Sequence, residues 1–280
     1  RRDCRGREAM KAVRRSLVVL AVLAAWPVLA TQDGASNYQG AAAEQFLLKG
    51  RITATKDAGE GVTLSRIVTL EHNGATHRGL FKTIDESKLG ATKLADGTID
   101  VGFQDSWQTE IAAYQVDLII GLGLVPATIE RRIGTNIGSV QWFVDYKMKE
   151  AERIEKKVSP PDLETWNRVM YKVRLFDQLI ANVDRHLKNI LVTENFEVRL
   201  IDHSRSFRIN RELTRPQDLA RFSQSLLEGI QKLEKQDLKK KTGRYLTDAQ
   251  IDRLLQRRDA ILSLAKKLVA ERGESAVIYP

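Results

Sequence analysis

Residues that can bind a cation and orient a hydroxyl group are concentrated in a short segment of the second half of the chain. Asp184 and Asn189 lie five residues apart, and Asp202 follows 13 residues after Asn189. The apolar stretches between Asn189 and Asp202 predict a short β-hairpin, which would bring Asp202 back beside the first two residues. Carboxylate and carboxamide oxygens placed in this way can hold Mg²⁺ together with substrate phosphates. The remaining aspartate can orient a hydroxyl group for in-line attack.

The residue order of this segment resembles the catalytic and metal loops of the protein-kinase-like superfamily. Residues 184–189 read Asp-Arg-His-Leu-Lys-Asn, and Ile-Leu-Val and then Leu-Ile-Asp follow. The Asp-Arg-His order is similar to that of phosphatidylinositol 3- and 4-kinases, HipA-type kinases and secretory-pathway kinases, whereas ordinary protein kinases have His-Arg-Asp. The resemblance implies that Asp184 orients or deprotonates the acceptor hydroxyl and that His186 helps to stabilise the transferring phosphoryl group. It also implies that Asn189 and Asp202 bind the metal ion.

Two residues in the first half of the chain fit the same resemblance. A kinase needs a lysine on a strand to neutralise the nucleotide phosphates and a glutamate on the following helix to hold that lysine. Lys82 comes late in a strand-like stretch, and Glu110 lies on the first predicted helix. The resemblance therefore assigns the α- and β-phosphates to Lys82 and the positioning of Lys82 to Glu110.

Two further segments are implied to bind the nucleotide. One resembles the glycine-rich loop whose backbone N–H groups approach the phosphates, and its residues are Gly59, Gly61 and Thr63. The other falls between the two halves, where the hinge of the family binds adenine, and its residues are Gln141, Phe143 and Val144. The resemblance covers roughly residues 50–210. It implies ATP as the phosphoryl donor and Mg²⁺, or alternatively Mn²⁺, as the metal.

The secondary structure predicted from apolar spacing places these residues in two lobes. The first half has one helix at about 105–120 and strand-like stretches at 46–54, 65–71, 77–84, 127–133 and 139–145. We expect a loop at 86–104 and a solvated connector at 147–157. Apart from the hairpin, the second half is helical, with predicted helices at 159–180, 216–238 and 247–273. This order predicts an α+β fold with a β-rich N-lobe and a helical C-lobe.

The composition fits a folded globular protein and excludes several kinds of site. Of the 280 residues, 42% are hydrophobic and 29% are charged. The single cysteine, Cys4, excludes a disulfide framework and a thiolate metal cluster, and four histidines leave little room for a multi-histidine metal site. The first thirty residues contain seven basic and two acidic residues, so they supply more than half of the net charge of +9. We therefore expect no nucleic-acid partner.

Residues 10–30 have the pattern of an export signal. A basic start is followed by an apolar run and then by small residues before Thr31, which predicts cleavage after Ala30. The alternative is an uncleaved N-terminal membrane anchor. The predicted location is the periplasm or the cell exterior, without a stable membrane span after cleavage. We expect the divisions of the chain to be an upstream artefact at 1–9, the signal at 10–30, a flexible tail at 31–45, the N-lobe at 46–145 and the C-lobe at 146–280.

Each candidate residue also has an ordinary structural interpretation. The glycine-rich stretch can be a simple turn. Lys82 can be a solvent-exposed strand residue, and Glu110 can be a surface residue whose role Asp117 could take. The two aspartates of the second half can cap a helix or begin a turn, and His186 can be a packed histidine. The basic run at 239–244 is expected to be a solvated loop, with binding of an acidic or phosphate-rich partner as the alternative.

Departures from the family pattern leave the function open. The glycine loop lacks a third glycine, the metal motif reads Asp-His-Ser, and no Ala-Pro-Glu anchor follows. An exported enzyme would also need a source of ATP outside the cytoplasm. We therefore weigh two functions: an ATP- and Mg²⁺-dependent kinase acting on a hydroxyl group of a protein or a lipid/inositol, and an exported pseudokinase that binds a nucleotide or a protein. Adenylyl transfer on the same fold is a third interpretation.

Overall fold

The computed structural model describes residues 38–59, 65–93, 99–210 and 212–280. The predicted signal at 10–30 and the residues 1–9 before it lie outside these ranges, as do the loop residues Gly61 and Thr63. No helix within the described ranges is both long enough and apolar enough to span a membrane.

The N-terminal lobe is rich in β-strands, as the sequence predicts, and an antiparallel sheet forms its centre. Its strands are hydrogen-bonded in the order β1-β2-β3-β7-β6, with the bounds Arg51–Asp57 (β1), Ser65–His72 (β2), Ala75–Lys82 (β3), Thr128–Ile133 (β6) and Asn136–Trp142 (β7). Asn73 and Gly74 both have positive φ and form the tight turn between β2 and β3. Because β3 is the central strand, Lys82 at its end is buried inside the lobe.

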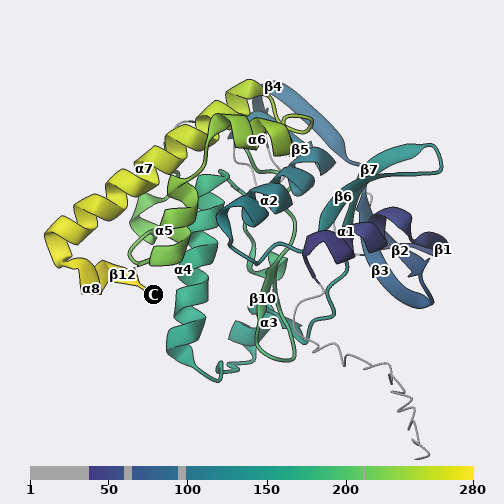
Figure 1. Ribbon diagram of the computed structural model, residues 1–280, viewed down its shortest axis with the longest axis horizontal. Coiled ribbons are helices and arrows are strands. Elements are labelled where there is room, and N and C mark those ends of the chain that lie inside the picture. The colour runs from purple at the N-terminus through teal and green to yellow at the C-terminus, as the bar shows by residue number, and fades with distance from the viewer. Residues whose placement is uncertain (1–37, 60–64, 94–98, 211) are drawn as a thin grey trace, which may run out of the picture. The chain divides into compact units, whose positions relative to one another are not determined.

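Helix α2 (Trp107–Ile120) lies between this sheet and the helical lobe (Figure 1). Ser106 caps its first turn by accepting a hydrogen bond from the N–H of Gln108, and Gly121 ends it in the left-handed conformation. These ends confirm the predicted helix. The helix contacts β6 and β7 in the sheet, and α5 (Gln224–Gln231) and α6 (Lys235–Thr242) in the helical lobe. Glu110, in its first turn, is therefore buried.

Two predictions for the N-terminal half are wrong. Residues 40–49 form helix α1 (Gly40–Lys49) instead of the end of a flexible tail and the start of a strand. Ala43 and Leu47 lie one helical turn apart and are both buried, and the run of alanines favours a helix. Residues 86–104 were predicted as a loop, but the described residues 86–93 and 99–104 belong to the paired strands β4 (Asp85–Lys93) and β5 (Ile99–Ser106). The glycines there favour a loop locally, but backbone pairing overrides that preference.

The predicted hairpin between Asn189 and Asp202 is confirmed. The short 3-10 helix η1 (Leu187–Asn189) leads into β9 (Ile190–Val192), which pairs with β10 (Val198–Leu200) and, on its other side, with β8 (Met148–Lys149). The N–H of Ile201 donates to the carbonyl of Asn189 at 3.1 Å. The hairpin therefore returns the chain to the residue from which it left, and Asp202 comes next to Asn189.

The helical lobe contains the two helices that the sequence identifies most clearly. α4 (Leu163–Leu179) buries large apolar side chains at helical spacing, and α7 (Asp248–Arg272) begins with a capping box formed by Thr247 and Gln250. α7, yellow in Figure 1, runs beside α4 and α5 and contacts both. The fold is therefore α+β, with an antiparallel sheet in the N-terminal lobe and helices in the C-terminal lobe, as predicted.

Three predictions for the C-terminal half are wrong. The predicted helix at 216–238 is divided into the 3-10 helix η2 (Pro216–Asp218), β11 (Phe222–Ser223), α5 and α6. β11 pairs in parallel with β12 (Ile278–Tyr279), which follows α8 (Glu274–Val277), and no local pattern reveals this distant contact. The segment at 147–157 is no solvated connector, because α3 (Glu150–Glu155) buries Glu150 in an ion pair with Arg153. The lysines of the basic run are exposed, as predicted, but they lie in the last turn of α6 instead of a loop.

Candidate functional site

Lys82 lies at the centre of a cluster of charged side chains. Its Nζ lies 2.5 Å from Oε1 of Glu110 and 2.7 Å from Oδ1 of Asp202. The Lys82 side chain is 8% exposed, that of Glu110 2% and that of Asp202 37%. The structure thus brings together three of the predicted site residues, which come from β3, from α2 and from the segment after β10.

Charge pairing keeps the buried members of this cluster ionised. Burial opposes the charged form of Lys82, but the carboxylates of Glu110 and Asp202 outweigh it and raise the pKa of Lys82 above its usual value. Burial likewise opposes ionisation of Glu110, but the charge of Lys82 outweighs it and holds the pKa of Glu110 below its usual value. Lys82 is therefore a fixed cation, and its more exposed partner, Asp202, is the one that a metal ion can reach.

His203 occupies a buried position beside Glu110. Its backbone N–H donates to Oε2 of Glu110 at 3.0 Å, and its ring meets that of Phe176 edge to face, with 5.9 Å between the ring centroids. Burial lowers the pKa of His203 despite the neighbouring Glu110, so the ring is neutral near pH 7. The Asp-His-Ser motif lacks the Phe-Gly of typical kinases. Its histidine nevertheless places a ring in the core, and the main-chain N–H of the same residue holds Glu110.

Residues 105–110, where β5 ends and α2 begins, are called the β5–α2 corner. This corner holds Ser204, the third residue of the Asp-His-Ser motif. The N–H of Ser106 and the hydroxyl of Thr109 both donate to the carbonyl of Ser204, each at 2.9 Å. Glu110 holds His203 from the same helical turn. The two residues after Asp202, His203 and Ser204, are therefore both hydrogen-bonded to the beginning of α2.

Asn189 and Asp202 face each other and fit a divalent cation. Nδ2 of Asn189 donates to Oδ2 of Asp202 at 3.3 Å. Asp202 has a φ of +63°, a strained conformation of the kind found at functional sites. Carboxylate and carboxamide oxygens are ligands that Mg²⁺ accepts. The described residues contain no group of three or more His, Cys, Asp or Glu side chains that could hold a metal, so a cation here would need further ligands from phosphate or water.

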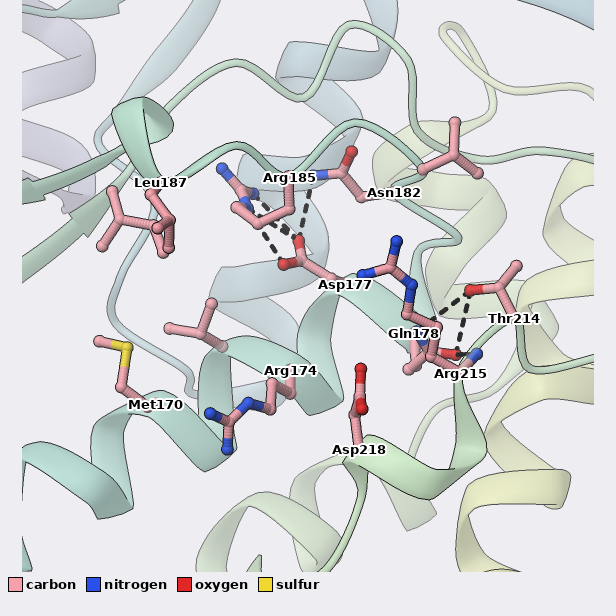
Figure 2. A pocket seen from close by; sticks show the side chains of 13 residues that line it. Met170, Arg174, Asp177, Gln178, Asn182, Arg185, Leu187, Thr214, Arg215 and Asp218 are labelled. Atoms are coloured by element: carbon pink, nitrogen blue, oxygen red, sulfur yellow. Dashed lines mark hydrogen bonds and ion pairs between the residues drawn. The ribbon is translucent and has the colours of Figure 1, made fainter. Parts of the chain in front are cut away.

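The loop between α4 and β9 is anchored by an ion pair (Figure 2). Arg185 contacts Asp177 of α4 through Nε and Nη2, each at 3.0 Å. Its Nη1 donates to the carbonyls of Asn189, at 3.3 Å, and of Ile201, at 2.7 Å. One guanidinium therefore holds both ends of the β9–β10 hairpin and fixes Asn189 relative to Asp202.

A cavity of about 380 Å³ lies beside this ion pair (Figure 2). Its lining includes Arg174, Arg215 and Asp218, together with Arg185 and Asp177. None of the site residues predicted from the sequence lines it. It is therefore distinct from the cleft in which the predicted residues meet.

Three predicted residues line one cleft of about 680 Å³, a volume typical of small-molecule sites. Lys82, Asn189 and Asp202 contribute charged and polar groups, and Leu80 and Ile201 contribute apolar side chains from the two lobes. The rim includes further charged residues: Lys149, Glu152, Glu155 and Lys188. A cleft with apolar walls and with a cation and oxygen donors in its lining is suited to a nucleotide.

The predicted glycine-rich loop begins and ends at this cleft. Ala58 and Ser65 line the cleft, and the N–H of Ala58 donates to the carbonyl of Ser65 at 3.0 Å. Gly59 is exposed and has a φ of +75°, in the region that favours glycine. Gly61 and Thr63 lie outside the described residues, so their role in phosphate binding stays a prediction.

Asp184 lies on a more open side of the site. Its Oδ1 lies 2.7 Å from Nε2 of His186, and its Oδ2 lies 3.2 Å from Nη1 of Arg205. The side chain of Asp184 is 29% exposed and that of His186 is 68% exposed, so His186 is not a packed histidine. The carboxylate of Asp184 is therefore held in place and remains accessible. A group that accepts a hydrogen bond from the hydroxyl of another molecule needs both properties.

The predicted hinge residues are not among those that line the cleft. Gln141 is buried, and its side chain donates to a hydroxyl on β6. The N–H of Phe143 donates to the carbonyl of Arg78 at 3.1 Å, and its carbonyl lies 3.0 Å from Nε2 of His77. Within the described part of the chain, the main chain of Val144 has no hydrogen-bond partner. Val144 itself is buried. The role of these residues in adenine binding stays a prediction.

Asp117 does not take the role of Glu110. Its carboxylate accepts hydrogen bonds from the N–H groups of three residues after α2, at 2.8–3.0 Å: Gly123, Leu124 and Val125. Gln39 donates to the same carboxylate at 2.9 Å. Asp117 therefore stabilises the turn after α2, and the contact with Lys82 belongs to Glu110.

Three charged residues that hold the site together were not predicted from the sequence. Asp177 holds Arg185, and Asp105 holds Arg205, which in turn contacts Asp184. Asp177 lies on the buried face of α4, and a carboxylate at an apolar position of a predicted helix is a signal that could have identified it. Asp105 and Arg205 are 100 residues apart, so no local pattern connects them.

Comparisons with known proteins identify the fold. No protein-family model matches the chain, and no curated protein matches it significantly. Among solved structures, a crystal structure of the Golgi casein kinase matches with a TM-score of 0.59 and 14% sequence identity, covering 84% of this chain and 77% of that chain. The Helicobacter pylori proinflammatory kinase CtkA matches with a TM-score of 0.47 and 12% identity, covering 82% of this chain and 98% of that chain. The first likeness confirms the predicted kinase-like, two-lobed fold.

Proposed function

We propose that the protein is a phosphotransferase that moves the γ-phosphoryl group of ATP to a hydroxyl group of a protein or lipid/inositol acceptor. The observation that carries this proposal is the contact of Lys82 with both Glu110 and Asp202, beside a cleft that Asn189 also lines. These residues supply a fixed ammonium group for phosphate oxygens and two oxygen donors for a cation. Positioning and charge neutralisation of this kind supply most of the acceleration in phosphoryl transfer.

Nucleotide binding in this proposal uses groups from both lobes. Leu80 and Ile201, which line the cleft, pack against the faces of adenine. The resemblance to kinases assigns the edge of adenine to the main chain of the segment from Gln141 to Val144. Lys82 binds the α- and β-phosphates, and its buried glutamate partner keeps it in place. The loop that starts at Gly59 covers the phosphates with backbone N–H groups.

Asn189 and Asp202 are the residues that would hold Mg²⁺ or Mn²⁺. Lys82 contacts one oxygen of Asp202 and Asn189 contacts the other, so the carboxylate is fixed in the cleft. When bound, the ion neutralises negative charge on the phosphate oxygens. The oxygen-donor set and the need for additional ligands both favour an ion shared with nucleotide phosphates.

Asp184 orients the acceptor in the transfer step. Its carboxylate accepts a hydrogen bond from the acceptor hydroxyl and directs the oxygen towards the γ-phosphorus. The acceptor oxygen forms a bond to that phosphorus while the bond from the phosphorus to the β–γ bridging oxygen breaks, and the electron pair leaves with ADP. The hydroxyl proton passes to Asp184 and then to water. His186, exposed beside Asp184, helps to stabilise the transferring phosphoryl group in this proposal.

Incubation of the purified chain with Mg²⁺ and γ-labelled ATP tests this function. We expect ATP and Mg²⁺ together to raise the Tm, and labelled phosphate to appear on the chain itself or on added protein and phosphoinositide acceptors. Asp202→Ala should abolish transfer, whereas Asp252→Asn, which breaks an exposed ion pair between α6 and α7, should not.

Three other outcomes have definite meanings. Binding without transfer would favour a non-catalytic module that binds nucleotide. An added AMP mass would favour adenylyl transfer. A chain that neither binds ATP nor transfers phosphate would contradict the proposal.

A further inference from the structure

Arg205 connects two sides of the site. It lies three residues after Asp202, and its guanidinium contacts two carboxylates from different lobes. Its Nε lies 3.1 Å from Oδ2 of Asp105, at the end of β5, and its Nη1 lies 3.2 Å from Oδ2 of Asp184, in the loop before β9. The residue is thus a direct bridge between the β5–α2 corner and the carboxylate proposed to orient the acceptor.

The surroundings of Arg205 fix its position. Asp105 is 2% exposed, and the guanidinium carbon of Arg205 lies 5.3 Å from the centre of the Phe103 ring. The preceding residue, Ser204, is hydrogen-bonded to the same corner through its carbonyl. Because the guanidinium is planar and is held at Nε, the Nη1 that reaches Asp184 has a defined direction.

Three carboxylates act on the charge of Arg205. Burial opposes its charged form, but the hydrogen bond to Asp105 and the charges of Asp184 and Asp202 outweigh it and raise the pKa of Arg205. The guanidinium is therefore charged at every working pH. It lies within electrostatic reach of the carboxylate proposed to hold the metal as well as of the carboxylate proposed to orient the acceptor.

Both oxygens of Asp184 are engaged, Oδ1 by His186 and Oδ2 by Arg205. A carboxylate oxygen can accept more than one hydrogen bond, so these contacts fix the plane of the carboxylate and leave lone pairs for a hydroxyl group. We propose that Arg205 is a positioning residue that holds Asp184 in the orientation needed for transfer and makes that orientation depend on the β5–α2 corner. This inference rests on the proposed function.

Arg205→Gln is the first test. A charge-assisted hydrogen bond is removed, so we expect kcat for phosphate transfer to fall by about 10- to 100-fold. The KM for ATP and the rise in Tm caused by ATP and Mg²⁺ should stay at wild-type values, because Lys82 and Asn189 keep their contacts. Arg205→Lys keeps the charge without the planar fork and should restore part of the lost kcat.

The anchor of Arg205 gives a second test. Asp105→Asn releases the other end of the bridge, so it should lower kcat in the same way. Because the two residues act as a unit, a variant carrying both Asp105→Asn and Arg205→Gln should lose no more kcat than Arg205→Gln alone. Losses that multiply in the double variant would show that Asp105 and Arg205 act separately, and would overturn the coupling to the corner.

Arg221→Gln is the matched control for Arg205→Gln. Arg221 is as exposed as Arg205, at 28%, and it has an ion pair of 3.3 Å with Glu164 and a ring contact of 5.7 Å with Tyr279, away from the site. If Arg205→Gln transfers phosphate as fast as Arg221→Gln, or loses ATP binding as much as transfer, the inference is overturned. A wild-type chain that transfers no phosphate overturns the proposed function, and this inference with it.

Discussion

The proposed nucleotide side and the proposed acceptor side of the site differ in how firmly the protein holds its charged groups. On the nucleotide side, Lys82 and Glu110 are 8% and 2% exposed, and each has two polar partners. On the acceptor side, Asp184 and His186 are 29% and 68% exposed, and their charged contacts are with each other and with Arg205. A buried, paired arrangement suits a partner of constant structure, such as the phosphates of ATP. An open arrangement suits acceptors of varied shape.

The difference has an energetic consequence. Removing one member of a buried ion pair leaves an uncompensated charge, which costs about 3–5 kcal/mol, whereas an exposed pair contributes about 0–1 kcal/mol. Substitutions on the nucleotide side should therefore affect stability and turnover together. Substitutions on the acceptor side should affect turnover alone.

Lys82→Met should have the largest effect. It removes the cation proposed to bind phosphates, so turnover should fall at least ~10²-fold, and it leaves Glu110 buried without its partner, so the Tm should fall as well. Transfer assays and thermal unfolding measure the two losses. Lys147→Met breaks a surface pair with Glu194 and serves as the control, with both quantities unchanged. If Lys82→Met kept the turnover of the wild type, Lys82 would not be the residue that binds the phosphates.

Asp184→Asn should separate transfer from binding. The carboxamide keeps the size of the side chain but cannot take the proton of the hydroxyl, so transfer should fall by about 10²-fold or more. ATP with Mg²⁺ should still raise the Tm as in the wild type, because Asp184 does not line the cleft. Both quantities are measured on the same samples. Equal losses of binding and transfer would mean that the two sides are not separate.

His203→Phe should have a small effect on turnover and a measurable one on stability. Within the described part of the chain, neither buried ring nitrogen has a hydrogen-bond partner, and Nδ1 lies 3.6 Å from Oε2 of Glu110, too far for a hydrogen bond. The backbone N–H that holds Glu110 remains in the variant. Denaturant unfolding should show a gain of about 1 kcal/mol, with turnover changed by less than about tenfold. Clear destabilisation would mean that the imidazole has a partner.

A change of pH should affect the nucleotide side less than any of these substitutions. The stability from Glu110, whose pKa is lowered, is present above its unfolded pKa of about 4.3 and is lost as the pH falls through the folded value. The stability from Lys82, whose pKa is raised, is present below its unfolded pKa of about 10.4 and is lost as the pH rises through the folded value. Between about pH 7.5 and about pH 9.5, Glu110 and Lys82 should both keep their charges, because this range lies above the first pKa and below the second. The rise in Tm caused by ATP and Mg²⁺ should therefore be constant across it. If this rise in Tm changed with a titration midpoint inside that pH range, Lys82 would not be held by both carboxylates.

The sequence predicts those parts of the molecule that depend on neighbours in the chain. The caps of α2 and α7 and the hairpin between Asn189 and Asp202 all follow from short patterns. The pairing of Lys82 with Glu110 was predicted as well, but only through the resemblance to kinases, because the two residues are 28 positions apart.

Contacts between distant segments could not be predicted from the sequence. The pairing of β11 with β12 and the bridge from Asp105 to Arg205 depend on the folded lobes alone. Gly138 is an intermediate case, since the sequence shows only a glycine next to a strand. In the structure, a Cβ at Gly138 would lie 2.0 Å from the carbonyl oxygen of Lys82, so glycine is needed for β7 to approach β3 this closely.

Convergence of Lys82, Asn189 and Asp202 on a nucleotide-bound cation is tested most directly by anomalous diffraction from crystals grown with Mn²⁺ and a non-hydrolysable ATP analogue. We predict an anomalous peak between Asn189 and Asp202, with phosphate oxygens of the analogue beside Nζ of Lys82. A cleft without the analogue, or Mn²⁺ bound away from both Asn189 and Asp202, would contradict the proposed nucleotide site.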